Sequence, residues 1–504
     1  MSAEQFTPRQ RLLITIAVMS ATVMQVLDTT IVNVALPHMQ GQLGATRDQI
    51  SWVLTSYLVS SGIFMPLTGF FTDKLGQRRY LMLSIGGFVI SSALCGLSTN
   101  IFEIVLFRLA QGVFGAALVP LSQSIMVNTY PLEERGRAMA IWGMGVMVGP
   151  ILGPTLGGYL TEVLSWRWTF FINVPVGILA MVLAIRVVPD TERRERKLDW
   201  TGFALIAAAI GSLQYILDRG NEVGWFSSNS IVALTVVSAL SFLAFLDHAV
   251  RKGDAALFRI GLFRDRNFAT ASLMIAVMGL GLFGAALLQP EMLEDLLNYP
   301  ALTAGLVMAP RGLASMLSML VVGRLIGKID ARLLMGTGIV LSVVGSWLMT
   351  WYNLQIDLFW VITPILLQGL GLGLIFVPMS TIAFSTLPPS DSAEAAGMFS
   401  LMRTIGSSIG ISIVTTVLTQ HTQIAWNQLG GHISATSSAL HQYLQQLGLR
   451  LHDAVTPHVL GQILAQQANM VAFNDSFMFI TWSFIVMFPL LLILRGGGLK
   501  TTRK

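Results

Sequence analysis

Two residues of opposite charge, Asp28 and Arg108, lie inside long apolar runs, where an ionisable side chain is costly and usually functional. At 1.5 Å per helical residue, Asp28 is roughly 12 Å from the end of its run and Arg108 roughly 10 Å from the start of its own. If these two ends face the same side of a membrane, the side chains can pair. A carboxylate there can bind and release a proton, whereas arginine keeps its proton and tunes the acid. The pattern predicts proton coupling at this pair, with a structural ion pair or helix clamp as the alternative.

Further polar residues in the apolar runs are candidates for contact with a substrate. Arg311 follows Met308-Ala309-Pro310 about ten residues into its run and favours an anionic or acidic ligand, whereas Arg403 is nearer an end and can snorkel. The uncharged candidates are Gln25, Asn33, Gln123, Asn128 and Gln289. Asp218 and Glu222 lie at the boundary of another run, where a solvated loop is the default reading and capture of a proton or cation is the alternative.

The runs that position these residues are membrane-spanning helices. The 504 residues are 54% hydrophobic and only 11% charged, against about 25% charged in soluble domains. This composition excludes an ordinary soluble enzyme and a disordered chain. Fourteen runs reach the roughly 20 residues that a bilayer core requires, and none shows the alternation of barrel strands. The single cysteine, Cys95, excludes an intrachain disulfide.

Lysine and arginine set the expected orientation. With the N-terminus inside, 24 of the 31 basic residues fall in inner loops and tails and four fall in outer loops. Such a bias predicts a cytoplasmic N-terminus, and an even number of spans puts the C-terminus on the same side. The net charge of +5 is therefore attributed to cytoplasmic loops and not to nucleic-acid binding.

The chain repeats itself. Gln111-Gly112, Pro120-Leu121-Ser122 and Pro131 recur as Gln368-Gly369, Pro378-Met379-Ser380 and Pro389. Spans 1–6 therefore match spans 9–14, and spans 7 and 8 are an insertion. Parallel repeats around a midplane site are a transporter architecture. We expect a six-helix bundle at 1–190, a two-helix insertion with linkers at 191–265, and a second six-helix bundle at 266–504 that includes an extracytoplasmic loop at 420–474.

Two glycine-rich segments of the first half carry further motifs. The loop after the second span reads from Gly69 through Asp73, Gly76, Arg78 and Arg79, and resembles the signature loop of major facilitator transporters, which in that family controls opening and closing of the halves. The fifth span resembles the antiporter motif, which in the family distinguishes exporters from importers. Its residues are Gly145, Gly149, Pro150, Gly153, Pro154 and Gly157. Small residues let helices approach closely, so simple packing is the alternative reading.

Within that superfamily, the sequence resembles the fourteen-span drug:proton antiporters of the EmrB/QacA group. This resemblance rests on Leu27 to Pro37, Arg108 to Gly112, Trp166 to Gly177 and Ala472 to Phe477, and covers almost the whole chain. It implies the all-α major facilitator fold in a bacterial inner membrane. It also implies a proton gradient in place of any cofactor, no metal, and amphipathic drugs as cargo.

The same resemblance implies partners for the outer loop. Pumps of the EmrB type work with a periplasmic adaptor that is EmrA-like and an outer-membrane channel that is TolC-like. In residues 420–474, the spacing of Leu440, Leu444, Leu447 and Leu451 predicts a short amphipathic helix. A helix lying on the membrane surface and a docking site for the adaptor are both open.

The expected function is proton-driven export of amphipathic toxic compounds by alternating access. An exporter of one metabolite or siderophore-like compound is the runner-up, and a membrane-embedded enzyme fits less well. No ATP-binding Walker A pattern is present, and no HExxH or Cys/His metal cluster.

The charge bias makes a testable prediction about topology. In a chain whose Cys95 is replaced, cysteines placed at 193–197 or 500–504 should react only after the membrane is permeabilised. Gln445→Cys should react with an impermeant maleimide in intact, outer-membrane-stripped cells. Labelling of Gln445→Cys only after permeabilisation would contradict the fourteen-span topology.

Overall fold

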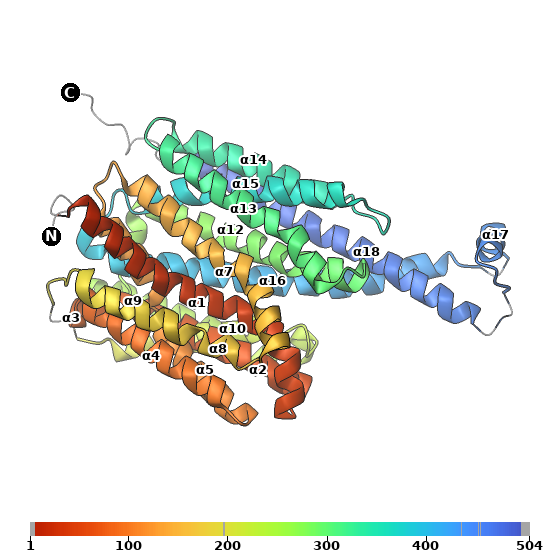
Figure 1. Cartoon of the computed structure of the whole chain (residues 1–504), viewed down its shortest axis with the longest axis horizontal. Helices are drawn as coiled ribbons and strands as arrows, with labels where there is room; N and C mark the ends of the chain where they lie inside the picture. Colours follow the sequence, from red (N-terminus) through yellow and green to blue (C-terminus); the bar gives the residue numbers. More distant parts are fainter. Residues whose placement is uncertain (1–5, 195–196, 435, 452, 454, 495–504) are drawn as a thin grey trace.

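The computed structural model describes residues 6–194, 197–434, 436–451, 453 and 455–494, so the expected inner positions 195–196 and 500–504 lie outside it. Within the described residues the chain is helical, apart from one isolated bridge between Ile326 and Ile329. Fourteen helical stretches there are long and apolar enough to cross a membrane, which confirms the predicted all-α class. Figure 1 shows these helices lying side by side, with α3 at one end of the molecule and α17 at the other.

The first six spans come from nine helices, because several spans break near their middle or their ends. Thr7 caps the first helix by accepting a hydrogen bond from the Gln10 N–H, and Asn100 caps the fifth in the same way. Gly76 has φ +82°, which gives the turn between the third and fourth helices. The helices are α1 (Pro8–Leu43), α2 (Arg47–Phe64), α3 (Thr68–Leu75), α4 (Gln77–Leu97), α5 (Ile101–Gly115), α6 (Leu118–Thr129), α7 (Arg135–Val163), α8 (Trp168–Phe171) and α9 (Asn173–Val187).

The inserted pair consists of α10 (Trp200–Arg219) and α11 (Asn229–Lys252). Asp199, which is buried, joins their ends: it accepts hydrogen bonds from Lys252 Nζ at 2.7 Å and from the Gly202 N–H at 3.1 Å, and His248 Nε2 lies 2.9 Å away. Burial alone would raise the pKa of Asp199, but these donors more than offset it and hold the pKa well below its usual range. The carboxylate therefore stays charged and fixes the inserted hairpin.

The last six spans repeat the arrangement of the first six. Asp265 and Asp330 cap two of the helices through the N–H groups of Phe268 and Arg332. The helices are α12 (Arg266–Glu291), α13 (Ala301–Leu325), α14 (Ala331–Met349), α15 (Leu358–Ala383), α16 (Ser392–Gly431), α17 (Ser438–Gln446), α18 (Thr456–Ile485) and α19 (Met487–Ile493). In this repeat α12 corresponds to α1, α13 to α2, α14 to α4 and α15 to α5–α6.

Helix α7 connects the two halves. Its glycines at intervals of four residues face α1: a Cβ on Gly149 would lie 2.6 Å from Val26 Cγ1, and one on Gly157 would lie 2.9 Å from the Ile31 carbonyl oxygen. The other side of α7 packs on α13, where Ile151 fills the space beside Gly312. Close approach on both sides makes α7 the mechanical link between α1 and the second half.

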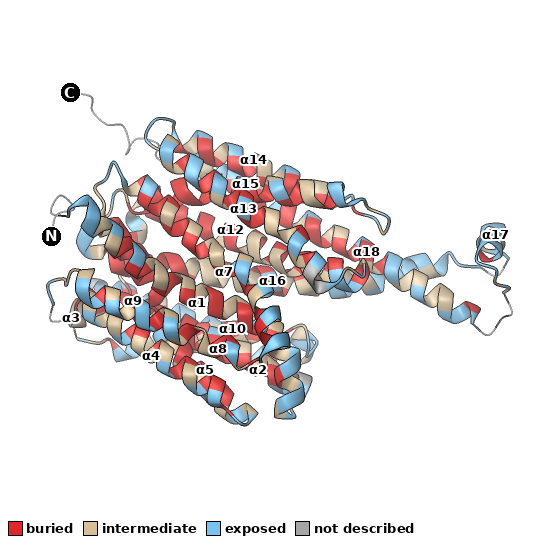
Figure 2. Cartoon of the chain, viewed as in Figure 1, coloured by how far each residue is buried: buried red, intermediate tan, exposed pale blue. Residues whose placement is uncertain are grey.

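Direct hydrogen bonds between the halves gather at the α3 end. Ser124 Oγ and Asn128 Nδ2 each lie 2.8 Å from Ser392 Oγ at the start of α16. The rings of Trp142 on α7 and Phe376 on α15 stack 5.8 Å apart, and both side chains are buried. Figure 2 shows buried residues along the faces where helices meet and exposed residues on the outside. The structure is therefore closed between the halves at this end.

At the opposite end, the inserted pair bridges the halves. Asp218 accepts a hydrogen bond from Thr55 on α2, and Arg219 donates to Ser51 at 2.8 Å. On the other side, Gln214 Oε1 accepts from Ser408 on α16 at 2.8 Å. The sequence repeat predicts that these helices are an insertion, but it does not predict that they join α2 to α16.

The end of α16 and the start of α18, with α17 between them, form a helical hairpin that projects beyond the bundle (Figure 1). The 40 residues of α16 span about 60 Å, roughly twice the thickness of a bilayer core. The expected amphipathic helix is present as α17, although it ends at Gln446 and does not reach Leu451. Helix α17 lies at the tip of the hairpin, at the far end of α16.

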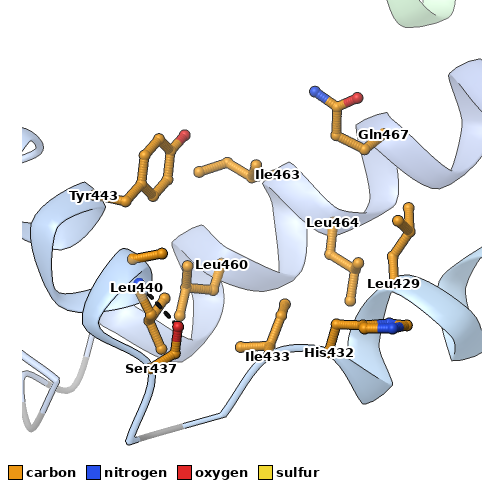
Figure 3. A pocket seen from close by; sticks show the side chains of 11 residues that line it. Leu429, His432, Ile433, Ser437, Leu440, Tyr443, Leu460, Ile463, Leu464 and Gln467 are labelled. Atoms are coloured by element: carbon orange, nitrogen blue, oxygen red, sulfur yellow. Dashed lines mark hydrogen bonds between the residues drawn. The ribbon is translucent and has the colours of Figure 1, made fainter.

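The hairpin tip carries an open pocket of about 350 Å³ (Figure 3). Leu429 and Ile433 line it from the end of α16, Leu440 from α17, and Leu460 and Leu464 from α18. Apolar side chains of all three helices therefore face one pocket.

The packing of α7 on α1 predicts a position-specific response to a single methyl group. Gly149→Ala should lower stability by about 1–3 kcal/mol, because its Cβ would meet both the side chain and the backbone of Val26. Gly158→Ala is the matched control on the same helix, since a Cβ there meets nothing within 4 Å and helix propensity favours alanine. The readout is thermal unfolding in detergent, and equal shifts for the two variants would contradict the close-packing interpretation.

Candidate functional site

Asp28 lies at the centre of a fully buried hydrogen-bond cluster in the first half. Its Oδ2 accepts from Arg108 Nη1 at 2.6 Å, so the pair that its depth made possible is present. Its Oδ1 accepts from Gln111 Nε2 at 2.9 Å and from Asn173 Nδ2 at 2.7 Å. Asp28 is 0% exposed and Arg108 1%. Both carboxylate oxygens are therefore satisfied, as a charge in a low-dielectric site requires.

Arg108 is held by groups from several helices. Its Nε donates to the Val53 carbonyl on α2 at 2.9 Å, and its Nη1 also donates to Gln111 Oε1 at 2.8 Å. Its guanidinium lies 4.3 Å from the centre of the Tyr57 ring, within cation–π distance. The ion pair consequently ties α1 and α5 to α2, which is also the helix that α10 contacts.

Three members of this cluster are not predicted from the sequence as functional residues. Gln111 and Asn173 occur only inside strings that resemble the family, and Ser92 on α4 lies outside those strings. Ser92 Oγ accepts from Asn173 Nδ2 at 3.0 Å and donates to the Phe170 carbonyl at 2.9 Å. A polar side chain in an apolar run can be recognised from the sequence, but this pattern does not predict which amides contact Asp28.

The candidate substrate residues of the first half are not brought together. Gln25 donates to the Tyr57 hydroxyl at 2.9 Å and so adjoins the Asp28 cluster. Asn33 is exposed. Gln123 is fully buried with both amide atoms unpaired among the described residues, and Asn128 belongs to the contact with Ser392.

The second half contains a related cluster on the corresponding helices. Arg311 on α13 donates to Gln289 Oε1 on α12 at 3.2 Å, and to the Leu282 carbonyl at 3.2 Å. Gln289 Nε2 lies 3.5 Å from Gln368 Oε1 on α15, and Gln368 Nε2 donates to Ser346 on α14 at 3.1 Å. Two of the candidate residues, Gln289 and Arg311, are thus in direct contact.

The signature loop lies against the second half. A Cβ on Gly69 would lie 2.7 Å from the Glu394 Cβ at the start of α16, and Gly76 packs on Asp190. The Asp73 carbonyl accepts from the Arg194 N–H at 2.8 Å. Arg78 is half-buried and Arg79 exposed.

Arg259, between α11 and α12, strengthens this contact and was not expected. It bonds Glu394 Oε2 through Nε at 2.9 Å and Asp391 through Nη1 at 3.1 Å. Burial alone would lower the pKa of Arg259, but the carboxylates of Glu394, Asp391 and Asp73 more than offset it and raise the pKa. These charges form an ion-pair cluster beside the signature loop.

The remaining candidates lie apart from the cluster. Asp218 forms part of the α2–α10 contact, and Glu222 pairs with Arg219 at 2.8 Å near the surface. In the part of the chain that the structure describes, no group of three His, Cys, Asp or Glu residues is arranged to hold a metal ion.

A buried ion pair in one of two repeated bundles, with a glycine-lined helix between them, is typical of one transporter superfamily. The family model of the Major Facilitator Superfamily matches residues 18–411. The chain belongs to the major facilitator superfamily. Its repeated halves and inserted α10–α11 pair are therefore those of a fourteen-span facilitator.

Curated relatives narrow the position of this facilitator within the superfamily. It is 35% identical over 500 residues to the multidrug export protein EmrB of Escherichia coli (strain K12), with 97% of each chain covered. It is 32% identical over 495 residues to the fatty acid resistance protein FarB of Neisseria gonorrhoeae, with 96% of this chain and 97% of that protein covered. The facilitator is thus an EmrB-like member, as its sequence motifs predict.

Solved structures share its fold at low identity. The proton:xylose symporter XylE aligns with a TM-score of 0.63 and 13% identity, over 98% of both chains. The human organic anion transporter MFSD10 aligns with a TM-score of 0.62 and 14% identity, over 95% of this chain and 100% of that one. These likenesses confirm the predicted major facilitator fold.

The buried pair predicts non-additive stability changes. Arg108→Gln alone should cost about 3–5 kcal/mol, because it leaves the Asp28 charge buried without its partner. The double variant Asp28→Asn/Arg108→Gln should lose much less than the sum of the two single changes. Arg251→Gln is the control: its pair with Asp247 has side chains 78% and 59% exposed, so stability should hardly change. Thermal unfolding in detergent gives all four values, and strict additivity would show that Asp28 and Arg108 do not couple.

Proposed function

We propose that this facilitator is a proton-driven antiporter that exports amphipathic, toxic compounds from the cytoplasm across a bacterial inner membrane. In this proposal both termini and the α3 end face the cytoplasm, and the α16–α18 hairpin projects into the periplasm. The single observation that carries it is the Asp28 cluster. It is a buried, titratable charge on the helix against which the antiporter-motif glycines of α7 pack.

Coupling follows from the geometry of the cluster. Asp28 accepts hydrogen bonds on both oxygens from Arg108, Gln111 and Asn173. Protonation of either oxygen removes an acceptor and leaves the Arg108 charge without its counter-ion. The donors must then rearrange, and any movement of α1 is transmitted to α7 and from there to α13. A proton entering from the periplasm thereby biases the equilibrium between two arrangements of the halves.

Gating is proposed for the α3 end. In this proposal the contacts of Gly69 and Arg259 with Glu394, and the Trp142–Phe376 stack, are those that close the route to the cytoplasm. Opening towards the cytoplasm requires these contacts to break. The signature loop, with Asp73, Gly76, Arg78 and Arg79, would then act as a latch and not as a substrate site.

The projecting hairpin supports a role in a larger assembly. We propose that it reaches the periplasmic adaptor, an EmrA-like protein, which connects the facilitator to a TolC-like outer-membrane channel. The length of α16 beyond a bilayer and the apolar pocket at the tip support this role. The proton gradient supplies the energy in this proposal, without a cofactor.

The test is drug-induced proton release from proteoliposomes that hold an imposed pH gradient and a trapped pH-sensitive dye. Asp28→Asn keeps the size of the side chain but cannot titrate, so it should reduce antiport at least tenfold. Asp247→Asn makes the same charge change at an exposed position of α11 and should retain wild-type transport. Antiport by Asp28→Asn at the wild-type rate would exclude Asp28 as the carrier and direct attention to Asp218 or Glu222.

A further inference from the structure

Helix α2 is held from two opposite faces. On one face, the Val53 carbonyl accepts from Arg108 Nε at 2.9 Å, and the centre of the Tyr57 ring lies 4.3 Å from the Arg108 guanidinium. On the other face, Ser51 and Thr55 bond to the inserted helix α10. Positions two residues apart on an α-helix are rotated by about 200°, so residues 51 and 55 face away from residues 53 and 57. Helix α2 therefore lies between the buried ion pair and the insertion.

Charged groups fix α10 to α2. Asp218 accepts a hydrogen bond from Thr55, and Arg219 donates to Ser51 at 2.8 Å. The two bonded positions of α2 are one helical turn apart, so the bonds restrain its rotation as well as its position. Hydrogen bonds in which one partner is ionised are stronger than those between neutral groups. The insertion is thus bonded firmly to the first half.

Packing between the same two helices is close. The ring centres of Trp52 and Tyr215 lie 5.8 Å apart. Further along α2, a Cβ on Gly62 would lie 3.2 Å from Ile210 Cγ2. A displacement of α10 is therefore transmitted to α2 over several turns and not through the hydrogen bonds alone.

The other side of the insertion is bonded to α16 of the second half by neutral groups. Gln214 Oε1 accepts from Ser408 Oγ at 2.8 Å. Trp225, just after α10, donates through Nε1 to Thr416 Oγ1 at 3.1 Å. Because these partners are uncharged, the bonds are weaker than those to α2. The insertion is thus a part of the first half that is also in contact with the second.

The charge that α2 helps to hold sets the charge balance at Asp28. The titratable groups around this carboxylate are Arg108 of α5, Tyr57 of α2 and Cys95 of α4, and α9 supplies the neutral amide of Asn173. Tyrosine and cysteine are largely uncharged at neutral pH. Stabilisation of the carboxylate therefore depends on how firmly Arg108 is held.

We propose that α10 positions the coupling pair: Asp218 and Arg219 hold α2 against Arg108, and the bonds of α10 to α16 make this hold depend on the position of the second half. The inference rests on the proposed function and assigns the inserted pair a part in coupling. Asp218 is a positioning residue here and not the carrier of the proton. Movement of the second half reaches the proton site through α10, although α16 touches neither member of the ion pair.

The first measurement requires no transport. Thermal unfolding of the full chain in detergent gives the coupling free energy between Asp28 and Arg108 from the single and double variants of the pair. The cycle is repeated with Thr55→Val, which removes the donor to Asp218 and keeps the shape of the side chain. The coupling should fall with Thr55→Val, because Arg108 is then held less firmly.

A matched control is available for the loss of a hydroxyl group. Ser407 lies next to Ser408 on α16, but its hydroxyl donates to the Arg403 carbonyl of the same helix. Ser407→Ala therefore removes a hydroxyl without breaking the bond to α10. It should leave the coupling between Asp28 and Arg108 unchanged.

The second measurement is the pH profile of drug-induced proton release from proteoliposomes. Thr55→Val should move the midpoint to higher pH by about half a unit to one unit, the equivalent of one hydrogen bond, since a less firmly held Arg108 stabilises the carboxylate less. Asp218→Ala should act in the same way. Asp218→Asn, which keeps an acceptor for Thr55, should move the midpoint less.

The link to the second half is tested by cutting it at its other end. Ser408→Ala should move the midpoint in the same direction as Thr55→Val, and Ser407→Ala should not move it. The double variant Thr55→Val/Ser408→Ala should shift no further than the larger single change, because both interrupt one path.

Two results would overturn the proposal. Lower stability of Thr55→Val with unchanged coupling and an unchanged midpoint would assign the insertion to packing alone. Strictly additive shifts in the double variant would show that α16 does not act through α10. Failure of the proposed function gives a different result: Asp28→Asn would then transport at the wild-type rate, while the stability cycle would still report whether Thr55 acts on the Asp28–Arg108 pair.

Discussion

The buried ion pair between Asp28 and Arg108 is the constraint on which the arrangement of the first half depends. Two charges removed from water must be brought within hydrogen-bond distance, and their remaining donors and acceptors must be satisfied. This requirement fixes α1, α2, α4, α5 and α9 around one point, since each contributes a bonded group. The glycines of α7 then allow this helix to sit close to α1, while its other side packs on α13.

The two halves have the same arrangement of helices but bury different charged groups. Repetition of spans produces equivalent positions such as Gln111 and Gln368, and the surroundings of these positions have diverged. The buried cluster of the first half contains an ion pair, Asp28 with Arg108, whereas that of the second half contains a cation, Arg311, with neutral acceptors. A symmetric fold thereby carries an asymmetric charge.

Much of the fold and part of the site follow from sequence. Apolar runs predict the fourteen spans. The pairing of Asp28 with Arg108 is predicted by their similar depth in the membrane, because each residue of a helix adds a fixed rise along its axis. The partners Gln111, Asn173 and Ser92 do not follow, since many amides and hydroxyls occur in these spans and only tertiary packing selects among them. Arg259 and Glu394 are 135 residues apart, and no local pattern relates them. The bridging position of α10 is likewise a property of three-dimensional packing.

Helix α16 is one continuous helix of 40 residues. It starts beside the ion pair of Arg259 with Glu394 and ends at the pocket in the hairpin tip. A rigid rod amplifies rotation. From Glu394 to Gly431 it measures about 55 Å, so a tilt of about 10° of the second half displaces the tip by about 10 Å. Any tilt of the second half would therefore reach the end of the hairpin as a large lateral displacement, by leverage alone.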